Sequence, residues 1–168
     1  MNLADRVSWC RAHLDAQDQH NWPQIVGDPL TVEPFSWYPD ELVQLHGMFD
    51  GLQTSLLQFH PYERQVMRLN EGKPAVTLGL GAVYHVFTVS LELKSLEVTL
   101  WDETDHETPE MWEEGEEPEP VFTCRDPLMF FDEYIFGPKY PELIDDILEV
   151  DPDHLVNDKW RGLLAQIN

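Results

Sequence analysis

The chain has 168 residues, which is enough for one compact domain with its own core and too few for two ordinary domains. It carries 32 Asp and Glu against 10 Lys and Arg, a formal net charge of −22, and such a field repels nucleic-acid backbones and anionic membranes. We therefore expect one cytoplasmic domain over residues 1–168 that has no signal peptide, spans no membrane and makes no direct contact with nucleic acid.

The first expected element is an amphipathic helix over roughly the first eighteen residues. Its apolar residues recur at helical spacing: Leu3, Val7, Cys10 and Leu14. This spacing places the four on one buried face, and Arg6, Arg11 and Asp15 would then point outward. Residues 21–35 contain several Pro and Gly, which break any helix, so we expect a connector there.

Two further helices are expected before the strands. One begins near Pro39, because Pro suits a first helical turn and Asp40 and Glu41 suit the positive end of a helix. Its buried stripe would consist of Leu42, Leu45, Phe49 and Leu52. The other begins at Pro61 and ends before Gly72. Its apolar side would consist of Tyr62, Val66 and Leu69.

Residues 75–102 are rich in β-branched and aromatic side chains and predict antiparallel strands. A two-residue turn at Lys94 and Ser95 would give one buried apolar face, formed by Val89, Leu91, Leu93, Leu96, Val98 and Leu100. On the other face the same register opposes Glu92 to Glu97. Like charges in that position destabilise a hairpin, so either Lys94 screens them or a cationic partner docks there.

An acidic stretch follows the hairpin. Ten carboxylates and no Lys or Arg lie between Trp101 and Pro120, and we expect an acidic loop at about residues 102–119. After it the sequence predicts a short strand at 120–124 and helices at 126–136, 140–150 and 151–167. The order of elements predicts an α+β fold, a single domain in which an antiparallel β-meander packs against several helices.

Motifs for enzyme chemistry are missing from the sequence. It holds no phosphate-binding loop, nucleophile elbow or zinc-protease helix. The nearest approach to a metal site is the set Asp102, Asp105, His106 and Glu107. That set lacks the glycine and the ligand alternation of a calcium-binding loop. Cys10 and Cys124 lie far apart and predict reduced, unpaired thiols. We therefore expect no catalytic residue, no metal and no cofactor.

Three segments resemble the SUKH superfamily, bacterial immunity proteins related to a fungal cell-wall regulator. "YPDELVQLHGMFDG" from Tyr38 resembles the first helix of that family, "SLEVTLWDE" from Ser95 a later strand, and "RDPLMFFDEYIFG" from Arg125 its closing helix. The resemblance covers about residues 37–137. The helix that begins at Pro61 is an insertion relative to the family pattern, and the acidic loop is longer than the usual turn. The resemblance implies a protein that binds and neutralises a toxin, often a nuclease.

We therefore expect an acidic binding protein, an immunity protein that neutralises a basic toxin such as a nuclease by occluding its cationic active site. The expected partner-binding residues are carboxylates that imitate phosphates and aromatic anchors: Glu92, Glu97, Trp101, Asp102, Glu103, Asp105, Trp112, Glu113, Glu114, Glu116 and Glu117.

Alternatives stay open. The acidic loop can be a solvated connection, in which case the next candidates for an interface are Asp145, Asp146, Glu149 and Asp153. The protein can also be a carboxylate-rich, metal-dependent hydrolase, or a housekeeping adaptor or nucleic-acid mimic that has no toxin partner.

Overall fold

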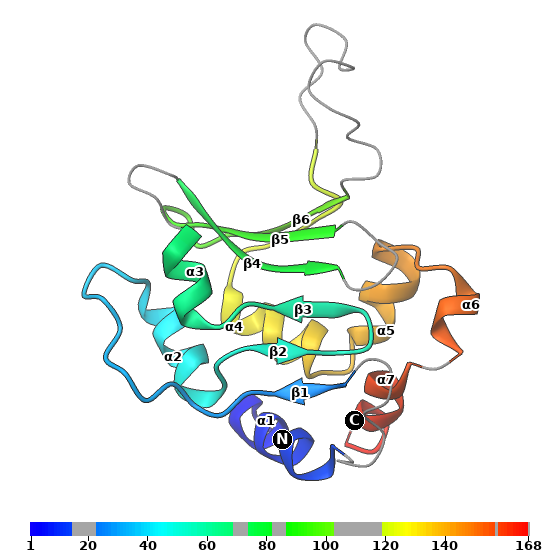
Figure 1. The fold of residues 1–168 in the computed structure, drawn as a ribbon. Helices are drawn as coiled ribbons and strands as arrows, with labels where there is room; N and C mark the ends of the chain where they lie inside the picture. The colour runs from blue at the N-terminus through cyan, green and yellow to red at the C-terminus, as the bar shows by residue number, and fades with distance from the viewer. Residues whose placement is uncertain (15–22, 69–73, 82–86, 103–118, 157, 168) are drawn as a thin grey trace, which may run out of the picture.

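The computed structural model describes residues 1–14, 23–68, 74–81, 87–102, 119–156 and 158–167. These residues form a seven-stranded antiparallel sheet with helices packed around it (Figure 1). The strands lie in the sheet in the order in which they follow one another along the chain, from β1 at one edge to β7 at the other. This is the predicted α+β fold, a β-meander packed against helices.

The described strands are shortest near the N-terminus and longest in the middle of the chain. They are β1 (Ile25–Val26), β2 (Leu52–Gln53), β3 (Leu57–Phe59), β4 (Ala75–Gly81), β5 (Phe87–Glu92), β6 (Val98–Asp102) and β7 (Phe122–Cys124). The three strands from β4 to β6 occupy the region in which the sequence predicts strands, and β7 lies within the predicted short strand.

The described helices are α1 (Leu3–His13), α2 (Asp40–Met48), α3 (Tyr62–Arg68), α4 (Pro127–Met129), η2 (Phe130–Ile135), α5 (Tyr140–Glu142), η3 (Leu143–Ile147), α6 (Pro152–Leu155) and α7 (Lys159–Leu164). The segments η2 and η3 are π-helical turns that continue α4 and α5 directly. The last predicted helix is split in two, because Asp158 caps a new helix by accepting a hydrogen bond from the amide of Arg161 at 3.1 Å. Within these described residues, no helix is long and apolar enough to cross a membrane.

The predicted N-terminal helix is confirmed as α1. The side chain of Asn2 caps its first turn, and Leu3, Val7 and Cys10 are buried on one face as the spacing predicts. The helix ends at His13, earlier than expected, because the next residue has an extended backbone.

Two basic residues of α1 do not point into solvent as expected. Arg6 Nη1 lies 2.7 Å from Asp132 Oδ1 and also donates to the carbonyl oxygen of Asp132 at 2.8 Å. Arg11 Nη2 donates to the carbonyl oxygens of Gly27 at 2.7 Å and Met48 at 2.6 Å. A guanidinium presents several donors in one rigid fork, so each arginine fastens α1 to a distant part of the chain.

The predicted connector contains β1, and the end of the predicted second helix belongs to the sheet. Helix α2 begins at Asp40, as expected, but the chain leaves it at Phe49, whose backbone is extended, and Leu52 lies in β2. Both side chains are buried, at 4% and 2% exposure. Strands of two or three residues are too short to show an alternating pattern, which is why the sequence does not reveal β1, β2 and β3.

The β5–β6 hairpin has the predicted register. Its pairs include Thr88–Trp101, Val89–Leu100, Ser90–Thr99 and Leu91–Val98. Of the six apolar residues predicted to share a face, the four nearest the middle of the strands are fully buried, and Leu93 and Leu96 pack partly buried against the same core. The apolar alternation therefore fixes which side of the hairpin faces inward.

The turn of this hairpin differs from the prediction. Leu93, Lys94 and Ser95 form a three-residue turn, and the amide of Leu96 donates to the carbonyl oxygen of Glu92 at 2.8 Å. Leu96 follows this turn with a left-handed φ of +60° and comes directly before Glu97, the residue that faces Glu92. A left-handed position of this kind usually holds glycine. Packing of the Leu96 side chain against the core supports the unusual backbone.

A β-bulge interrupts β4. Thr77 pairs with Ser90 and Gly79 pairs with Val89, so Leu78 is an extra residue between two registered pairs. Leu78 is buried at 1% exposure, two residues after the buried Val76, and the bulge then places Gly79 opposite the buried Val89.

The C-terminal third of the chain covers the inner face of the sheet. Figure 1 shows α4 and α5 behind the strands. The rings of Phe59 and Phe131 lie 4.9 Å apart, edge to face, and join β3 to η2. Trp160 in α7 is fully buried and its Nε1–H donates to the carbonyl oxygen of Ile135 at 2.8 Å. The buried apolar residues form one cluster, and the described part of the chain therefore has a single core.

The two thiols are unpaired, as predicted. Cys10 is fully buried and Cys124 is 4% exposed, and neither forms a disulfide. Burial raises the pKa of the Cys10 thiol to about 12, so this side chain stays protonated and packs as a small apolar group.

Candidate binding surface on the outer face of the sheet

A row of hydroxyl groups crosses the sheet on the face opposite the core. Four residues, one from each strand between β4 and β7, pair in the order Thr77, Ser90, Thr99 and Thr123. Each is partly or fully exposed, whereas the residues on either side of it in the same strand are buried or, for Phe122, partly buried against the core. Because successive side chains point to opposite faces, the row lies away from the core. We call this side of β4 to β7 the outer face.

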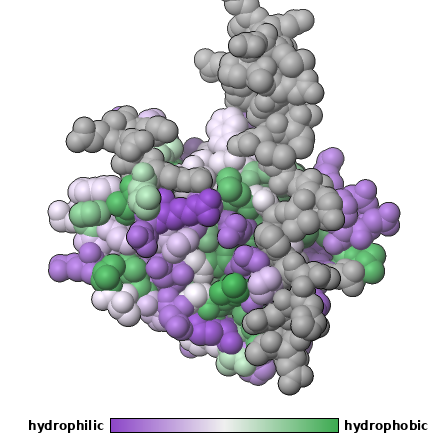
Figure 2. Space-filling model, viewed as in Figure 1, coloured by the Kyte–Doolittle hydropathy of each residue, from purple (hydrophilic) through white to green (hydrophobic). Residues whose placement is uncertain are grey.

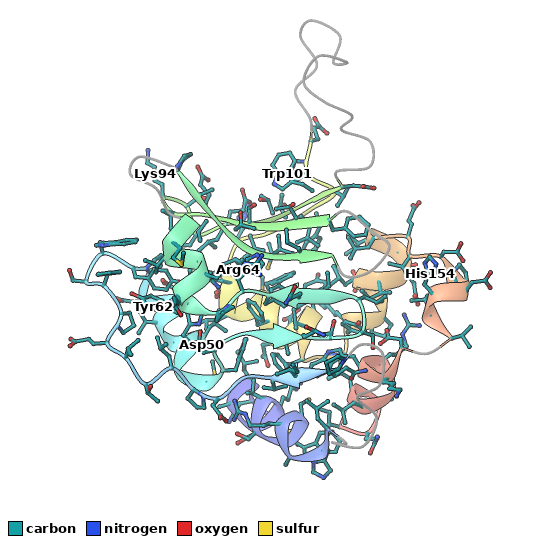
Figure 3. The ribbon with its side chains drawn as sticks, in the orientation of Figure 1. Asp50, Tyr62, Arg64, Lys94, Trp101 and His154 are labelled. Atoms are coloured by element: carbon teal, nitrogen blue, oxygen red, sulfur yellow. The ribbon has the colours of Figure 1, made fainter. Side chains whose placement is uncertain are left out.

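Trp101 adds an aromatic ring to the outer face. It pairs with Thr88, and its Nε1–H donates to Thr99 Oγ1 at 3.0 Å. The ring is partly exposed, so its polar atom is satisfied within the face while part of its surface remains in contact with solvent. Figure 3 shows Trp101 toward the far end of β6, away from Lys94 at the hairpin tip. A tryptophan held in this way presents a large, oriented surface.

Two carboxylates lie at the hairpin tip. The Glu92 amide donates to the carbonyl oxygen of Glu97 at 2.9 Å, so the two residues face each other across the strands as predicted. Ser95 Oγ donates to the Glu92 carboxylate and accepts from the Glu97 amide at 3.3 Å. Lys94 forms an ion pair with neither glutamate, although all three residues lie in the described part of the chain. The opposed charges are therefore not neutralised by the only lysine of the tip.

The structure brings together three of the predicted partner-binding residues. Glu92, Glu97 and Trp101 share the outer face, while Asp102 ends β6 opposite Phe87, at a position of the inner face. The other predicted residues lie outside the described ranges: Glu103, Asp105, Trp112, Glu113, Glu114, Glu116 and Glu117. Thr77 and Thr123 complete the hydroxyl row. The sequence pattern does not specify the pairings of β4 with β5 and of β6 with β7 that bring these two residues into the row.

The described residues contain no group of three or more His, Cys, Asp or Glu side chains that could hold a metal ion. Of the four residues that the sequence singled out as the nearest approach to a metal site, only Asp102 lies within the described ranges.

The four C-terminal carboxylates predicted as the alternative interface all lie within the described ranges. Asp145 Oδ1 pairs with Arg161 Nη2 at 2.5 Å, and Asp146, Glu149 and Asp153 are exposed.

A second polar arrangement is buried between α2 and α3, and the sequence gives no sign of it. The hydroxyl of Tyr38 donates to Gln65 Oε1 at 2.5 Å and lies 3.1 Å from His46 Nε2. His46 Nδ1 in turn lies 2.9 Å from Asp50 Oδ1, which also accepts from the amide of Tyr62 at 2.7 Å. The chain of contacts joins the loop before α2 to both helices. We call it the Tyr38 network.

Burial dominates the electrostatics of the Tyr38 network. It lowers the pKa of His46 below its ordinary value, and the nearby Asp50 carboxylate opposes that effect. Burial also raises the pKa of the Tyr38 hydroxyl, with smaller contributions from Tyr62 and Asp50. Tyr38 is 3% exposed and His46 4%, so these two side chains are closed to solvent, whereas the Asp50 side chain at the end of the network is 22% exposed.

No family model, curated protein or solved structure matches this chain.

Proposed function

We propose that this protein binds a basic partner protein through the outer face and blocks its activity, as an immunity protein that neutralises a toxin. A cationic nuclease domain is the partner that fits best, because an acidic surface with an aromatic anchor can occupy a cleft made for phosphates. The resemblance to the SUKH superfamily over residues 37–137 implies the same class of function.

One observation carries the proposal: the β5–β6 register places Glu92, Glu97 and Trp101 on the outer face together. Opposed glutamates weaken a hairpin, and within the described residues no ion pair to a lysine neutralises them. A basic group from a partner would remove this repulsion. The ring of Trp101, further along the same hairpin, offers the apolar contact on which binding energy is usually concentrated.

The chemistry of the surrounding surface agrees with a protein partner. Ser90 and Thr99 of the hydroxyl row lie between the carboxylates and Trp101 on the hairpin, and their side chains are uncharged and accept or donate hydrogen bonds. The acidic residues 103–118 connect β6 to β7, the two strands that carry Trp101 and Thr123. An uncharged centre with acidic ends matches a cationic surface better than it matches a phosphate ligand.

The test begins with capture of partners from the source organism, using the purified chain as bait, followed by binding kinetics with the basic protein recovered. The variant Glu92→Gln/Glu97→Gln should slow association and flatten its salt dependence, because exposed charges mainly steer encounter. Trp101→Ala should instead speed dissociation, since truncating a desolvated anchor costs about 2 kcal/mol or roughly thirtyfold in Kd. The captured protein should lose its toxic activity when the parent chain is bound.

The acidic stretch and a matched control complete the experiment. Glutamine at Glu113, Glu114, Glu116 and Glu117 should act like the hairpin variant, and Trp112→Ala like Trp101→Ala. The control Asp146→Asn/Glu149→Gln removes the same charge from exposed sites on the C-terminal part of the chain and should leave the kinetics unchanged. If the control slows binding and the hairpin variant does not, the interface lies at the C-terminal carboxylates and the outer face is not the binding surface.

A further inference from the structure

Two aromatic rings are exposed side by side on the loop between β1 and α2. Phe35 is 54% exposed and Trp37 55%, and their centroids lie 5.6 Å apart with ring planes only 9° from parallel. Figure 2 shows apolar and polar residues interspersed over the visible face, not one broad apolar surface. Single exposed apolar residues are ordinary, but large rings that form a contiguous patch mark binding surfaces. We call this pair the aromatic platform.

Hydrogen bonds hold the aromatic platform in place. The amide of Phe35 donates to the hydroxyl of Tyr62 in α3 at 2.8 Å, and the amide of Tyr38 donates to the carbonyl oxygen of Phe35 at 2.9 Å. Below the rings, Tyr38 is buried and meets Tyr62 edge to face at 5.0 Å. The Tyr38 network fixes this support. The platform is thus pre-organised, and a ligand that binds it does not have to order the loop.

The charged residues that flank the aromatic platform along the chain are all acidic. No Lys or Arg occurs in the sequence between Arg11 and Arg64. Glu33, Asp40 and Glu41 flank the rings in the chain, are partly or fully exposed, and form no ion pair within the described residues. Flat neutral rings bordered by carboxylates suit a cation that can both stack and form hydrogen bonds. The guanidinium group does both, whereas an ammonium group does not stack.

We propose that Phe35 and Trp37 form a docking site for an arginine side chain of a basic protein segment, with Glu33, Asp40 and Glu41 as its ionic surroundings. The proposal rests on the proposed function in taking the partner to be basic, but it names a second surface. The outer face and the aromatic platform are formed by different elements, since one lies on β4 to β7 and the other on the loop before α2.

The test compares two peptides of equal charge, tetra-arginine and tetra-lysine, by fluorescence anisotropy against the purified chain at one low salt concentration. Attraction to the net charge of the protein acts equally on both peptides, so their difference reports stacking. The parent should bind tetra-arginine roughly fivefold more tightly than tetra-lysine. Trp37→Ala should abolish this preference, and Trp37→Phe, which keeps a ring, should restore part of it.

Controls separate the aromatic platform from the rest of the surface. Val156→Ala trims a side chain that is 79% exposed and belongs to neither surface, and it should keep the arginine preference. Thermal unfolding of each variant checks that the fold is intact. Because the outer face is tested separately with its natural partner, the two proposals fail independently.

Three results would overturn the docking site. The first is a parent that shows no preference between the peptides, and the second is a Trp37→Ala variant that retains the full preference; either shows that the rings do not select arginine. The third result concerns a different occupant, a second copy of this chain. Sedimentation that finds a concentration-dependent dimer in the parent and only monomer in Trp37→Ala would show that the platform is a self-association surface.

Discussion

Tyr38, in the loop before α2, connects this loop to α2 and α3. Its hydroxyl contacts Gln65 of α3 and His46 of α2, and its ring supports the exposed rings of the aromatic platform. Groups buried at such a site have no access to water, so each polar atom depends on its protein partner. The Tyr38 hydroxyl therefore supplies one contact to each of two other buried side chains.

The variant Tyr38→Phe tests this dependence. It should lower the free energy of unfolding by roughly 1–3 kcal/mol, because Gln65 and His46 would each lose a buried partner. Tyr134→Phe is the matched control, since Tyr134 is only partly buried and its hydroxyl forms no hydrogen bond with described residues; it should change stability by less than about 0.5 kcal/mol. Urea titration of the parent and the two variants measures these free energies of unfolding. Equal losses of stability in both variants would count against the Tyr38 network.

At the level of elements, the bulge in β4 brings its backbone close to β3. A Cβ atom added at Gly79 would lie 2.5 Å from the carbonyl oxygen of Gln58 and 2.9 Å from the Phe59 ring. Both contacts are shorter than van der Waals distance, and one involves main chain that is fixed by the sheet. Glycine is therefore required at this position for packing.

Gly79→Ala should cost roughly 1–3 kcal/mol of unfolding free energy, the usual range for forcing an extra methyl group into a packed sheet. Gly47→Ala makes the same chemical change near the end of α2, where nothing lies within 4 Å of the added atom. It should stabilise the protein by about 0.5–1 kcal/mol, because alanine favours the helix more than glycine does. Denaturant midpoints give both values, and a stabilising Gly79→Ala would mean that β3 and β4 are further apart than described.

The elements also show what a sequence can predict. The hairpin register follows from period-two alternation over a dozen residues, and with it the shared position of Glu92, Glu97 and Trp101 on one face. The turn differs because a left-handed Leu96 is stabilised by packing, which no local signal reports. The aromatic platform and the Tyr38 network depend on contacts between segments far apart in the chain. The only local sign is "FSWY", three aromatic residues within four positions of a Pro-bounded connector.

For the molecule as a whole, three of the ten Lys and Arg residues link distant segments. Arg6 joins α1 to Asp132 of η2, Arg11 joins α1 to Met48, and Arg161 joins α7 to Asp145 of η3. Partly buried arginines with several acceptors hold such links better than exposed lysines would. With these cations committed to the fold, the strand positions of the outer face have hydroxyl and acidic groups but no Lys or Arg.

The strands lie in the sheet in the same order as in the chain, and this order affects how the protein folds during synthesis on the ribosome. Each strand after β1 pairs with the strand translated just before it, so the sheet can form while the chain is being synthesised. The helices from α4 onward, which cover the inner face of the sheet, are translated last. Until then Val89, Leu91, Val98 and Leu100 have no cover from that part of the chain. Nascent chains stalled after Cys124 should therefore aggregate or bind chaperones, and full-length chains should not, which sedimentation of in vitro translation products would show.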